Sequence, residues 1–388
     1  MVNLFQDFET RSLIDLKQRG LPVYSSHPST EVLLLSYAFD RGPVELWEPH
    51  VGPPPQKLVN ALKDPTVRKV AWNAAFEHDI WAKVLGVPTS YSEWFDVKVE
   101  ASYLSLAGGL GDVCQILEMP ENDAKIKEGD SLITLFSSPY RRVGEATIFG
   151  VAEPSFHDWS TRPAEWQRFR EYCARDTEVE RKLFYMFEPV AMEYLQSDKG
   201  WVLDRKINDA GVPVNLTRLQ KALRMVEGSS DNPTFGSKEY LMKEFRGLTG
   251  LENPNSRDQL LPWLQKNGYP FMSLNKVLVR RALIMGIPQA CKDALVLRLE
   301  AAKTSYSKFK AIADRVSEDG RQRDMFVYMG AARTGRWSGY GVQFQNLPRP
   351  LKAVEKNLDR ALDLIDKEDA KTLVEEFVQP NEYTQKRT

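Results

Sequence analysis

Four short segments near the start of the chain are rich in branched aliphatic and aromatic side chains and end at turn-forming residues, as β-strands do. They read LFQDFET, EVLLLSYAFD, PVELWEP and RKVAWNA, and all lie within residues 4–74. Helix-like segments at 55–64 and 74–86 lie before and after the fourth. This combination predicts an α/β domain with a mixed sheet flanked by helices.

The rest of the chain predicts a change of architecture. Residues 108–162 are loop-rich, and residues 162–201 form a long helical stretch that is interrupted or ends around Pro189. Most of the remaining sequence is helical apart from strands at 321–331 and 341–348. A boundary near Lys199–Asp204 is the best division. We therefore predict an α/β domain at 1–200, a mostly helical region at 201–350, and a helical tail at 351–388.

Charge is distributed unevenly along the chain. Residues 272–349 contain 14 Lys and Arg against 6 Asp and Glu, a net charge of +8, and the rest has 38 basic and 47 acidic residues, a net charge of −9. A basic region of this kind is typical of a surface that faces phosphates, although solvated helix faces give the same count.

The sequence predicts a cytoplasmic protein. The three cysteines, Cys114, Cys173 and Cys291, form no CxxC pair, which is typical of a reducing compartment. No stretch of about 18 apolar residues is present, and a strand-like pattern begins within the first residues, so no signal peptide is expected. The four histidines have no metal-ligand spacing with a cysteine, so any metal is expected to have oxygen ligands.

Acidic residues recur at positions that bring them together. Asp7 and Glu9 lie two residues apart on the first strand and so share one face. Glu77 lies in the first turn of the helix after the fourth strand, and Tyr172 and Asp176 are four apart on a helix and share its face. Clustered carboxylates are typical ligands of hard divalent cations. Two such cations can promote hydrolysis of a phosphodiester by activating water and stabilising the leaving oxygen.

Each of these residues also has a purely structural interpretation. An acid pair on a strand is often a solvated face, and Glu77 is favoured by the helix dipole in any first turn. Tyr172 is equally suited to a core, with Asp176 paired to Arg175 or Lys182. Their joint order and spacing favour the metal site.

The segments DFET, NAAFE and YCARD resemble the three exonuclease motifs of the DEDD superfamily. The resemblance implies a ribonuclease H-like fold, 3′→5′ hydrolysis of nucleic acid, and two bound Mg²⁺ (or Mn²⁺) ions. It assigns Asp7 and Glu9 to the first motif, Glu77 to the second, and Tyr172 with Asp176 to the third, in the tyrosine class. The four acids are the implied metal ligands, and all five residues are implied to be catalytic.

One position departs from that pattern, and two further residues are implied by it. The second motif usually has Asp where this chain has Glu77, with Asp79 as a nearby alternative. By its place in the motif, Asn73 is expected to help hold the DNA end. Asp96 falls where such enzymes often have a supporting acid, so it is expected to act indirectly.

The segment GAARTGRWSGYGVQFQNLPRP resembles the start of the palm of family A DNA polymerases, where it lies against the primer–template duplex. INDAGVPVN, NPNSRDQL and LEAAKTSYSKF also resemble that family, in its bacteriophage and prophage branch, so the resemblance runs from Asp7 to about Pro350. The region 201–350 is thereby identified as polymerase thumb and early palm. The expected DNA-binding residues are Lys303, Lys308, Lys310, Arg333, Thr334, Gly335, Arg336, Gln345 and Asn346. A turn between strands with solvated arginines is the alternative.

The chain reaches Thr388 before any motif in which that family places its palm aspartates. We therefore expect no polymerisation by this chain alone, and palm and fingers would come from a second polypeptide. The expected function is that of a 3′→5′ proofreading exonuclease on DNA, as the front part of a replicative family A polymerase. The alternative is a non-catalytic subunit that binds primer–template.

Overall fold

The computed structural model of the chain describes residues 1–106, 108–120, 128–140, 146–147, 150–151, 154–195, 199–228, 236–301, 305–331, 334–347 and 349–377. These residues form two compact units. The first comprises 1–213 and 315–345, and the second comprises 214–314 and 346–388. By packing, the segment 315–345 therefore belongs with the N-terminal residues, whereas the sequence grouped it with 201–350. The assignment of exonuclease, thumb and tail domains remains a prediction.

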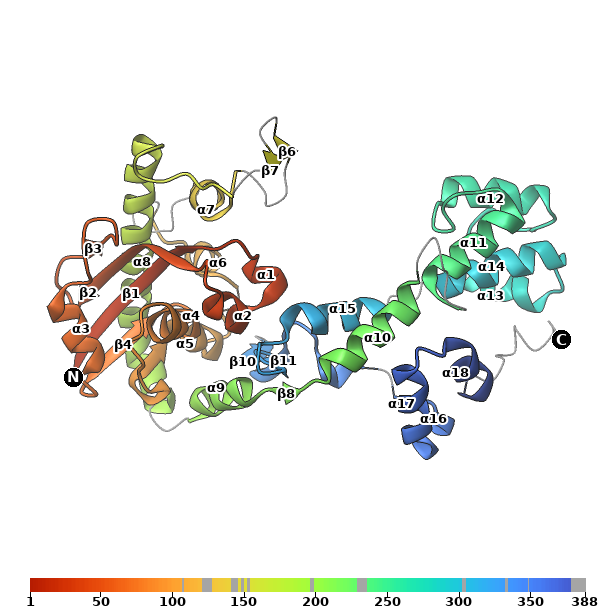
Figure 1. Cartoon of the computed structure of the whole chain (residues 1–388). Helices are drawn as coiled ribbons and strands as arrows, with labels where there is room; N and C mark the ends of the chain where they lie inside the picture. Colours follow the sequence, from red (N-terminus) through yellow and green to blue (C-terminus); the bar gives the residue numbers. More distant parts are fainter. Residues whose placement is uncertain are drawn as a thin grey trace. The chain divides into compact units, whose positions relative to one another are not determined.

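The first unit is built on a five-stranded sheet in the order β3-β2-β1-β4-β5 (Figure 1). Its strands are β1 (Val2–Arg11), β2 (Glu31–Phe39), β3 (Glu45–Trp47), β4 (Val67–Ala71) and β5 (Trp94–Asp96). β2 is antiparallel to both of its neighbours, and β1, β4 and β5 are parallel. This order, with only the second strand reversed, is that of the ribonuclease H-like fold, and the predicted α/β fold class is confirmed.

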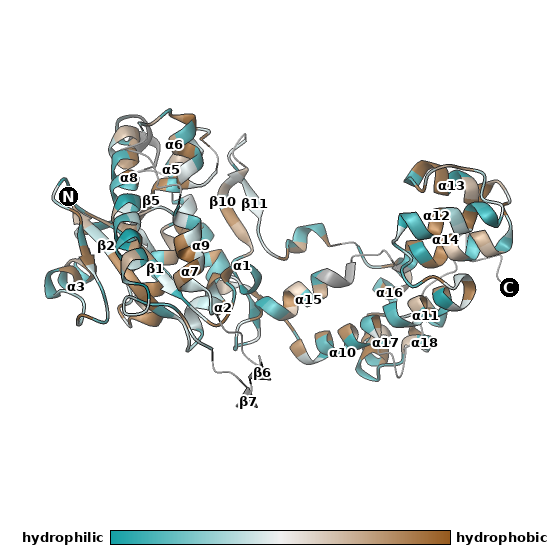
Figure 2. Cartoon of the chain, turned by 90° about the horizontal axis from the view of Figure 1, so that it is seen from above, coloured by the Kyte–Doolittle hydropathy of each residue, from teal (hydrophilic) through white to brown (hydrophobic). Residues whose placement is uncertain are grey.

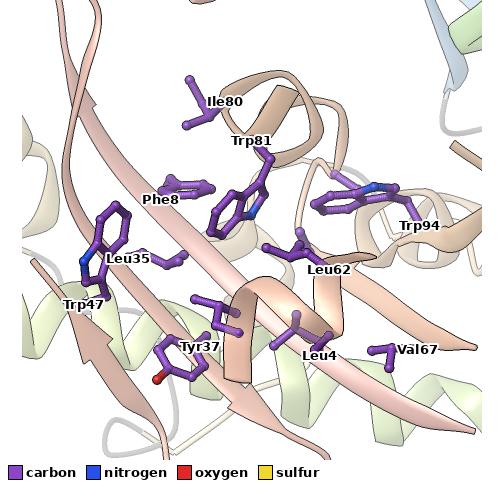
Figure 3. Packing of buried hydrophobic residues seen from close by; sticks show 14 of the residues in the cluster. Leu4, Phe8, Leu35, Tyr37, Trp47, Leu62, Val67, Ile80, Trp81 and Trp94 are labelled. Carbon is purple, nitrogen blue, oxygen red and sulfur yellow. The ribbon is translucent and has the colours of Figure 1, made fainter. Parts of the chain in front are cut away.

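Helices cover both faces of the sheet. On one face, α3 (Gln56–Lys63), α4 (Ala75–Asp79) and the π-helical turn η1 (Ile80–Val84) enclose a core with Leu4 and Phe8 of β1 (Figure 3). The other face is covered by α5 (Val97–Tyr103), α6 (Leu110–Ile116), α7 (Gly129–Ser137) and α8 (Pro163–Leu195). These helices carry both hydrophobic and hydrophilic residues (Figure 2), as expected of helices with one buried side.

Four local predictions differ from the structure. α8 continues through Pro189, and the loop-rich region 108–162 contains α6, α7 and the short strands β6 (Ala146–Thr147) and β7 (Gly150–Val151). The described residues 341–347 contain the 3₁₀ turn η4 (Phe344–Asn346) and not the expected strand, because β10 (Phe326–Ala331) instead pairs with β11 (Arg336–Gly339). The periodicity of FDVKVEASYLSLA also predicts a helix over 95–107, but this helix begins only after β5, where Asp96 caps α5.

Most of the second unit is helical. Its elements are α10 (Leu216–Glu227), α11 (Lys238–Thr249), α12 (Arg257–Lys266), α13 (Lys276–Ile284), α14 (Gln289–Ala301), most of α15 (Ser305–Arg315), α16 (Lys352–Lys356), α17 (Leu358–Asp366) and α18 (Ala370–Phe377). Asn215, Ser237 and Asn275 cap α10, α11 and α13 through their side chains, which satisfies N–H groups that lack helical partners. α11–α14 share one apolar core. Among the described residues, no helix is long and apolar enough to cross a bilayer, and the cytoplasmic location remains a prediction.

Candidate metal centre

The two acids of β1 point toward helix α8. Leu4 and Phe8 pack into the core beneath α3 and α4, whereas Phe5 packs with α8 residues on the opposite face. Asp7 and Glu9 follow Phe5 at intervals of two and so share its face. The sulfur of Cys173, on α8, lies 3.8 Å from Oδ2 of Asp7. Glu9 is buried and Asp7 is partly buried.

Helix α8 contributes the tyrosine and the last acid. Tyr172 and Asp176 are both buried, and their side chains are hydrogen-bonded to each other. Burial, followed by the nearby charge of Glu9 and then that of Asp176, raises the pKa of Tyr172 far above its usual value. The phenol therefore stays protonated at any physiological pH and can donate a hydrogen bond.

Glu77 reaches the same place from α4, which follows β4. Its carboxylate is buried, and its Oε2 has no hydrogen-bond partner among the described residues. Burial and then the charge of Asp7 raise the pKa of Glu77 well above the usual range. Asp79 is instead ion-paired with Lys83 at 2.6 Å and accepts a hydrogen bond from Ser25. Of the two candidates for the second-motif acid, Glu77 therefore lies within reach of the charge of Asp7, whereas Asp79 is paired with Lys83.

The structure thus brings Asp7, Glu9, Glu77, Asp176 and Tyr172 together from β1, α4 and α8. Ligand atoms of Asp7, Glu9 and Cys173 lie within 4.8 Å of one another. Burial and then the charge of Asp7 raise the pKa of the Cys173 thiol well above normal, so a thiolate ligand is disfavoured. A carboxylate cluster with one buried, unpaired oxygen at Glu77 fits a hard divalent cation with oxygen ligands.

Asp96 supports the turn that leads to Glu77. Its Oδ1 accepts hydrogen bonds from the backbone N–H groups of Asn73 and Lys98, both at 3.0 Å. Asn73 has a φ of 71°, a left-handed conformation that Asn tolerates better than most residues. Asp96 therefore stabilises an unusual backbone four residues before Glu77. Asn73 and Asp96 also line a cleft of about 510 Å³ in the first unit.

The expected duplex-binding residues are divided between the two units. Thr334 and Gly335 form the turn between β10 and β11, where both N–H groups bond to the carbonyl of Ala331. Arg336 begins β11 and is exposed. Gln345, in the first unit, is exposed too. Lys303 and Arg333 lie outside the described residues.

Of the expected duplex-binding residues that the structure describes, three belong to the second unit. Lys308 donates a hydrogen bond to the carbonyl of Asn346 at 2.8 Å, and Lys310 is exposed on the same helix. The Lys308 contact links α15 to η4, two segments that are 38 residues apart in sequence. The side chains of Lys310 and Asn346 face solvent.

The hairpin β10–β11 is anchored on α9 (Gly200–Ala210) by a polar network that the sequence did not reveal. Trp337 donates its indole N–H to Asp204 at 2.7 Å, and Asp204 is ion-paired with Arg205 at 2.7 Å. Asn208 bonds through its side chain to the backbone of Met325 and Phe326. The hairpin is therefore a fixed part of the first unit.

Sequence reasoning also missed two buried residues beside the acids. Cys173 follows Tyr172 directly, and Glu180 lies one helical turn beyond Asp176 on the same face of α8. A search for polar residues at every fourth position of α8 would have found Glu180. No comparable signal exists for Cys173, which reads as an ordinary apolar position.

Comparison with known proteins finds a relative by sequence and a number of solved structures, among them a POL domain and an RNase D. The chain is 35% identical over 369 residues to the DNA polymerase of Bacillus phage SP02, a match that covers 94% of this chain and 54% of that protein. The POL domain of Pol1 from M. smegmatis, solved with DNA primer–template and dNTP, has a TM-score of 0.50 at 15% identity, covering 90% of this chain and 53% of that chain. RNase D of Escherichia coli has a TM-score of 0.31 at 12% identity, covering 95% of this chain and 69% of that one, which is too low to establish a shared fold. No family model matches the chain.

A mixed sheet of ribonuclease H-like order, with acids gathered beside its first strand, defines a nuclease-like α/β protein. The match to the phage enzyme is more specific: over nearly its whole length the chain is similar to a DNA polymerase of bacteriophage type. It spans about half the length of that phage polymerase.

Proposed function

We propose that this chain is a 3′→5′ exonuclease that removes nucleotides from DNA by hydrolysis. Water attacks the terminal phosphodiester, the bond between phosphorus and the 3′ oxygen breaks, and a 5′-nucleoside monophosphate leaves. The observation that carries the proposal is the convergence of Asp7, Glu9, Glu77 and Asp176 beside the hydroxyl of Tyr172.

The four carboxylates would hold two divalent cations, Mg²⁺ or Mn²⁺. Two such ions, when bound, lower the pKa of the attacking water and stabilise the leaving oxygen. Tyr172 orients the attacking water, since its phenol stays protonated and is already fixed by Asp176. Asn73, which precedes Glu77 by four residues, holds the end of the DNA strand.

The expected DNA-binding residues bind the primer–template duplex on which this exonuclease acts. Arg336, Thr334 and Gly335 on the hairpin turn, with Gln345, contact the primer–template through phosphates and base or sugar edges. Lys308, Lys310 and Asn346 are proposed DNA contacts of the second unit, and Lys303 and Arg333 are proposed DNA contacts as well. In domain terms we propose exonuclease at 1–200, thumb and early palm at 201–350, and a helical tail at 351–388. The protein acts in DNA replication in a bacterial or phage-infected cell.

A digestion assay separates the exonuclease from a non-catalytic primer–template subunit. A 5′-labelled single-stranded oligonucleotide is incubated with Mg²⁺, Mn²⁺ or EDTA, and shortening is followed on a gel. We expect stepwise shortening from the 3′ end with metal only. Asp7→Ala and Asp176→Ala should each abolish it while the thermal unfolding of the metal-free protein stays near wild type, because relief of repulsion offsets the lost contacts. Digestion at the wild-type rate by both variants would refute the proposal.

A further inference from the structure

Strands β1 and β4 separate next to the candidate metal centre. Their parallel pairing runs from Val2 opposite Val67 to Phe5 opposite Val70, and it stops there. Beyond that point the backbone N–H of Gln6 donates to Oε1 of Glu180 at 3.1 Å, and the N–H of Trp72 donates to Oε2 at 2.8 Å. One carboxylate therefore joins the two strand ends where the ladder of backbone hydrogen bonds has ended.

The carboxylate that makes this link is deeply buried. Glu180 is 1% exposed and projects from α8, one turn after Asp176. Burial, followed by the charges of Asp7 and Glu77, raises its pKa well above normal. A third acid so close to two others is costly, and an apolar residue would fill the same space without repulsion. The two N–H groups explain its presence, because a buried N–H without a hydrogen-bond partner destabilises the folded state.

Both linked residues precede a ligand-bearing segment. Gln6 is directly followed by Asp7, and Trp72 starts the turn through Asn73 to α4, which carries Glu77. The side chain of Gln6 is held on the other face by the indole N–H of Trp81 at 2.7 Å. Any movement of the two strand ends relative to each other would therefore change the separation of Asp7 and Glu77.

We propose that Glu180 is a positioning residue, which fixes Asp7 and Glu77 at one separation by binding the backbone on either side of the strand gap. The inference rests on the exonuclease function proposed above and adds to it a residue that touches neither metal nor DNA. It acts through main-chain N–H groups, so its effect should be on the affinity for metal and on kcat, and not on the KM for DNA.

Two substitutions separate the link from simple packing. Glu180→Gln keeps the shape of the side chain but turns an NH₂ group toward one of the two N–H donors, so one hydrogen bond is lost. Glu180→Met keeps the length of the side chain and fills the same space with apolar atoms, but it removes both hydrogen-bond acceptors. The matched control is Glu171→Gln, the same change at an exposed position on α8.

The first measurement is binding of Mn²⁺ alone to the DNA-free protein by isothermal titration calorimetry. We expect affinity to fall about 10–100-fold in Glu180→Gln, as for outer groups that orient metal ligands, and further in Glu180→Met, with Glu171→Gln unchanged. kcat on single-stranded DNA should fall in the same order while KM stays constant. If both Glu180 variants have the Mn²⁺ affinity and kcat of the wild type, the inference is wrong. The exonuclease proposal would still hold in that case, provided that the wild-type protein digests DNA.

The second measurement does not depend on metal or on activity. Hydrogen exchange of peptides that contain Gln6 and Trp72 is compared between wild type and Glu180→Met under conditions where both are folded. We expect faster exchange at these two segments and no change in β2. Equal protection of both segments would overturn the link, whatever the outcome of the nuclease assays.

Discussion

The backbone of Gly129 lies directly against the ring of Tyr172. A Cβ on Gly129 would come within 2.2 Å of Cε2 of that ring. On α8 itself, Phe169 is parallel to Tyr172 with ring centroids 6.2 Å apart. Helix α7, within a region that the sequence marked as loop-rich, therefore fixes the position of the predicted catalytic phenol.

We predict that Gly129→Ala lowers exonuclease activity without touching any acid. The added methyl must push the Tyr172 ring, and a misplacement of about 1 Å can cost about 100-fold in rate. Thermal unfolding should show a loss of about 1–3 kcal/mol from overpacking. Gly247→Ala is the control, since a Cβ there meets no atom within 4 Å. Wild-type kcat in Gly129→Ala would contradict the prediction.

For Tyr172→Phe we expect slower hydrolysis and unchanged binding of Mn²⁺. Only the hydroxyl is lost, and a hydrogen bond to a charged group contributes about 1.5–3 kcal/mol, which corresponds to about 10–100-fold in kcat. Single-turnover kinetics give the rate, and calorimetry gives the affinity. A parallel loss of Mn²⁺ affinity would instead make the phenol a ligand.

Replacing Arg333 and Arg336 together with Ala should weaken binding to primer–template duplex. Each neutralised phosphate releases counterions, so the slope of log affinity against log salt should flatten by about two units. Fluorescence anisotropy over a range of salt concentrations measures this slope. Lys63→Ala, an exposed charge at the end of α3, should leave it unchanged, and digestion of short single strands should survive in the double variant. An unaltered slope would mean that the hairpin does not contact phosphates.

Glu100 should make the stability of the protein depend on pH. It is fully buried on α5, and neither carboxylate oxygen has a hydrogen-bond partner among the described residues. Burial, and then the charge of Glu188, raises the pKa of Glu100 from 4.5 to about 8. The folded state therefore keeps a proton that the unfolded state releases, and the free energy of unfolding should fall as pH rises between these values.

The Glu100→Gln variant tests this dependence, since it cannot titrate. In urea unfolding at several pH values, the free energy of unfolding of the variant should decline less with rising pH than that of wild type. The difference in free energy of unfolding between the two should be largest above about pH 8. Glu318→Gln, an exposed position, should follow wild type throughout. Parallel curves for wild type and Glu100→Gln would show that Glu100 is ionised in the folded state at all these pH values.

Local periodicity predicted what depends on a single element. The interval of two placed Asp7 and Glu9 on one face of β1, and the interval of four placed Tyr172 and Asp176 on one face of α8. The ribonuclease H-like fold followed from the resemblance of the acidic motifs. The position of Glu180 could have been found from the spacing on α8, but its role, like that of Gly129, escaped prediction because it depends on where β1 ends its pairing and where α7 packs. These are long-range relationships, and no window of sequence contains both partners.

The pairing of β8 (Val212–Pro213) with β9 (Arg321–Gln322) has an entropic consequence for the second unit. The chain leaves the first unit after Pro213 and re-enters it at Arg315, and Arg321 also donates to the carbonyl of Ala210 at 2.6 Å. Once the first unit has folded, the segment 214–314 is a closed loop even when it is itself unfolded. Closing a loop of about a hundred residues removes about 4 kcal/mol of chain entropy, and the intact chain loses this entropy with the folding of the first unit. When the segment 214–314 is produced as a separate fragment, its own folding must supply this loss of chain entropy. Its helices should therefore unfold at a lower denaturant concentration than they do within the whole protein.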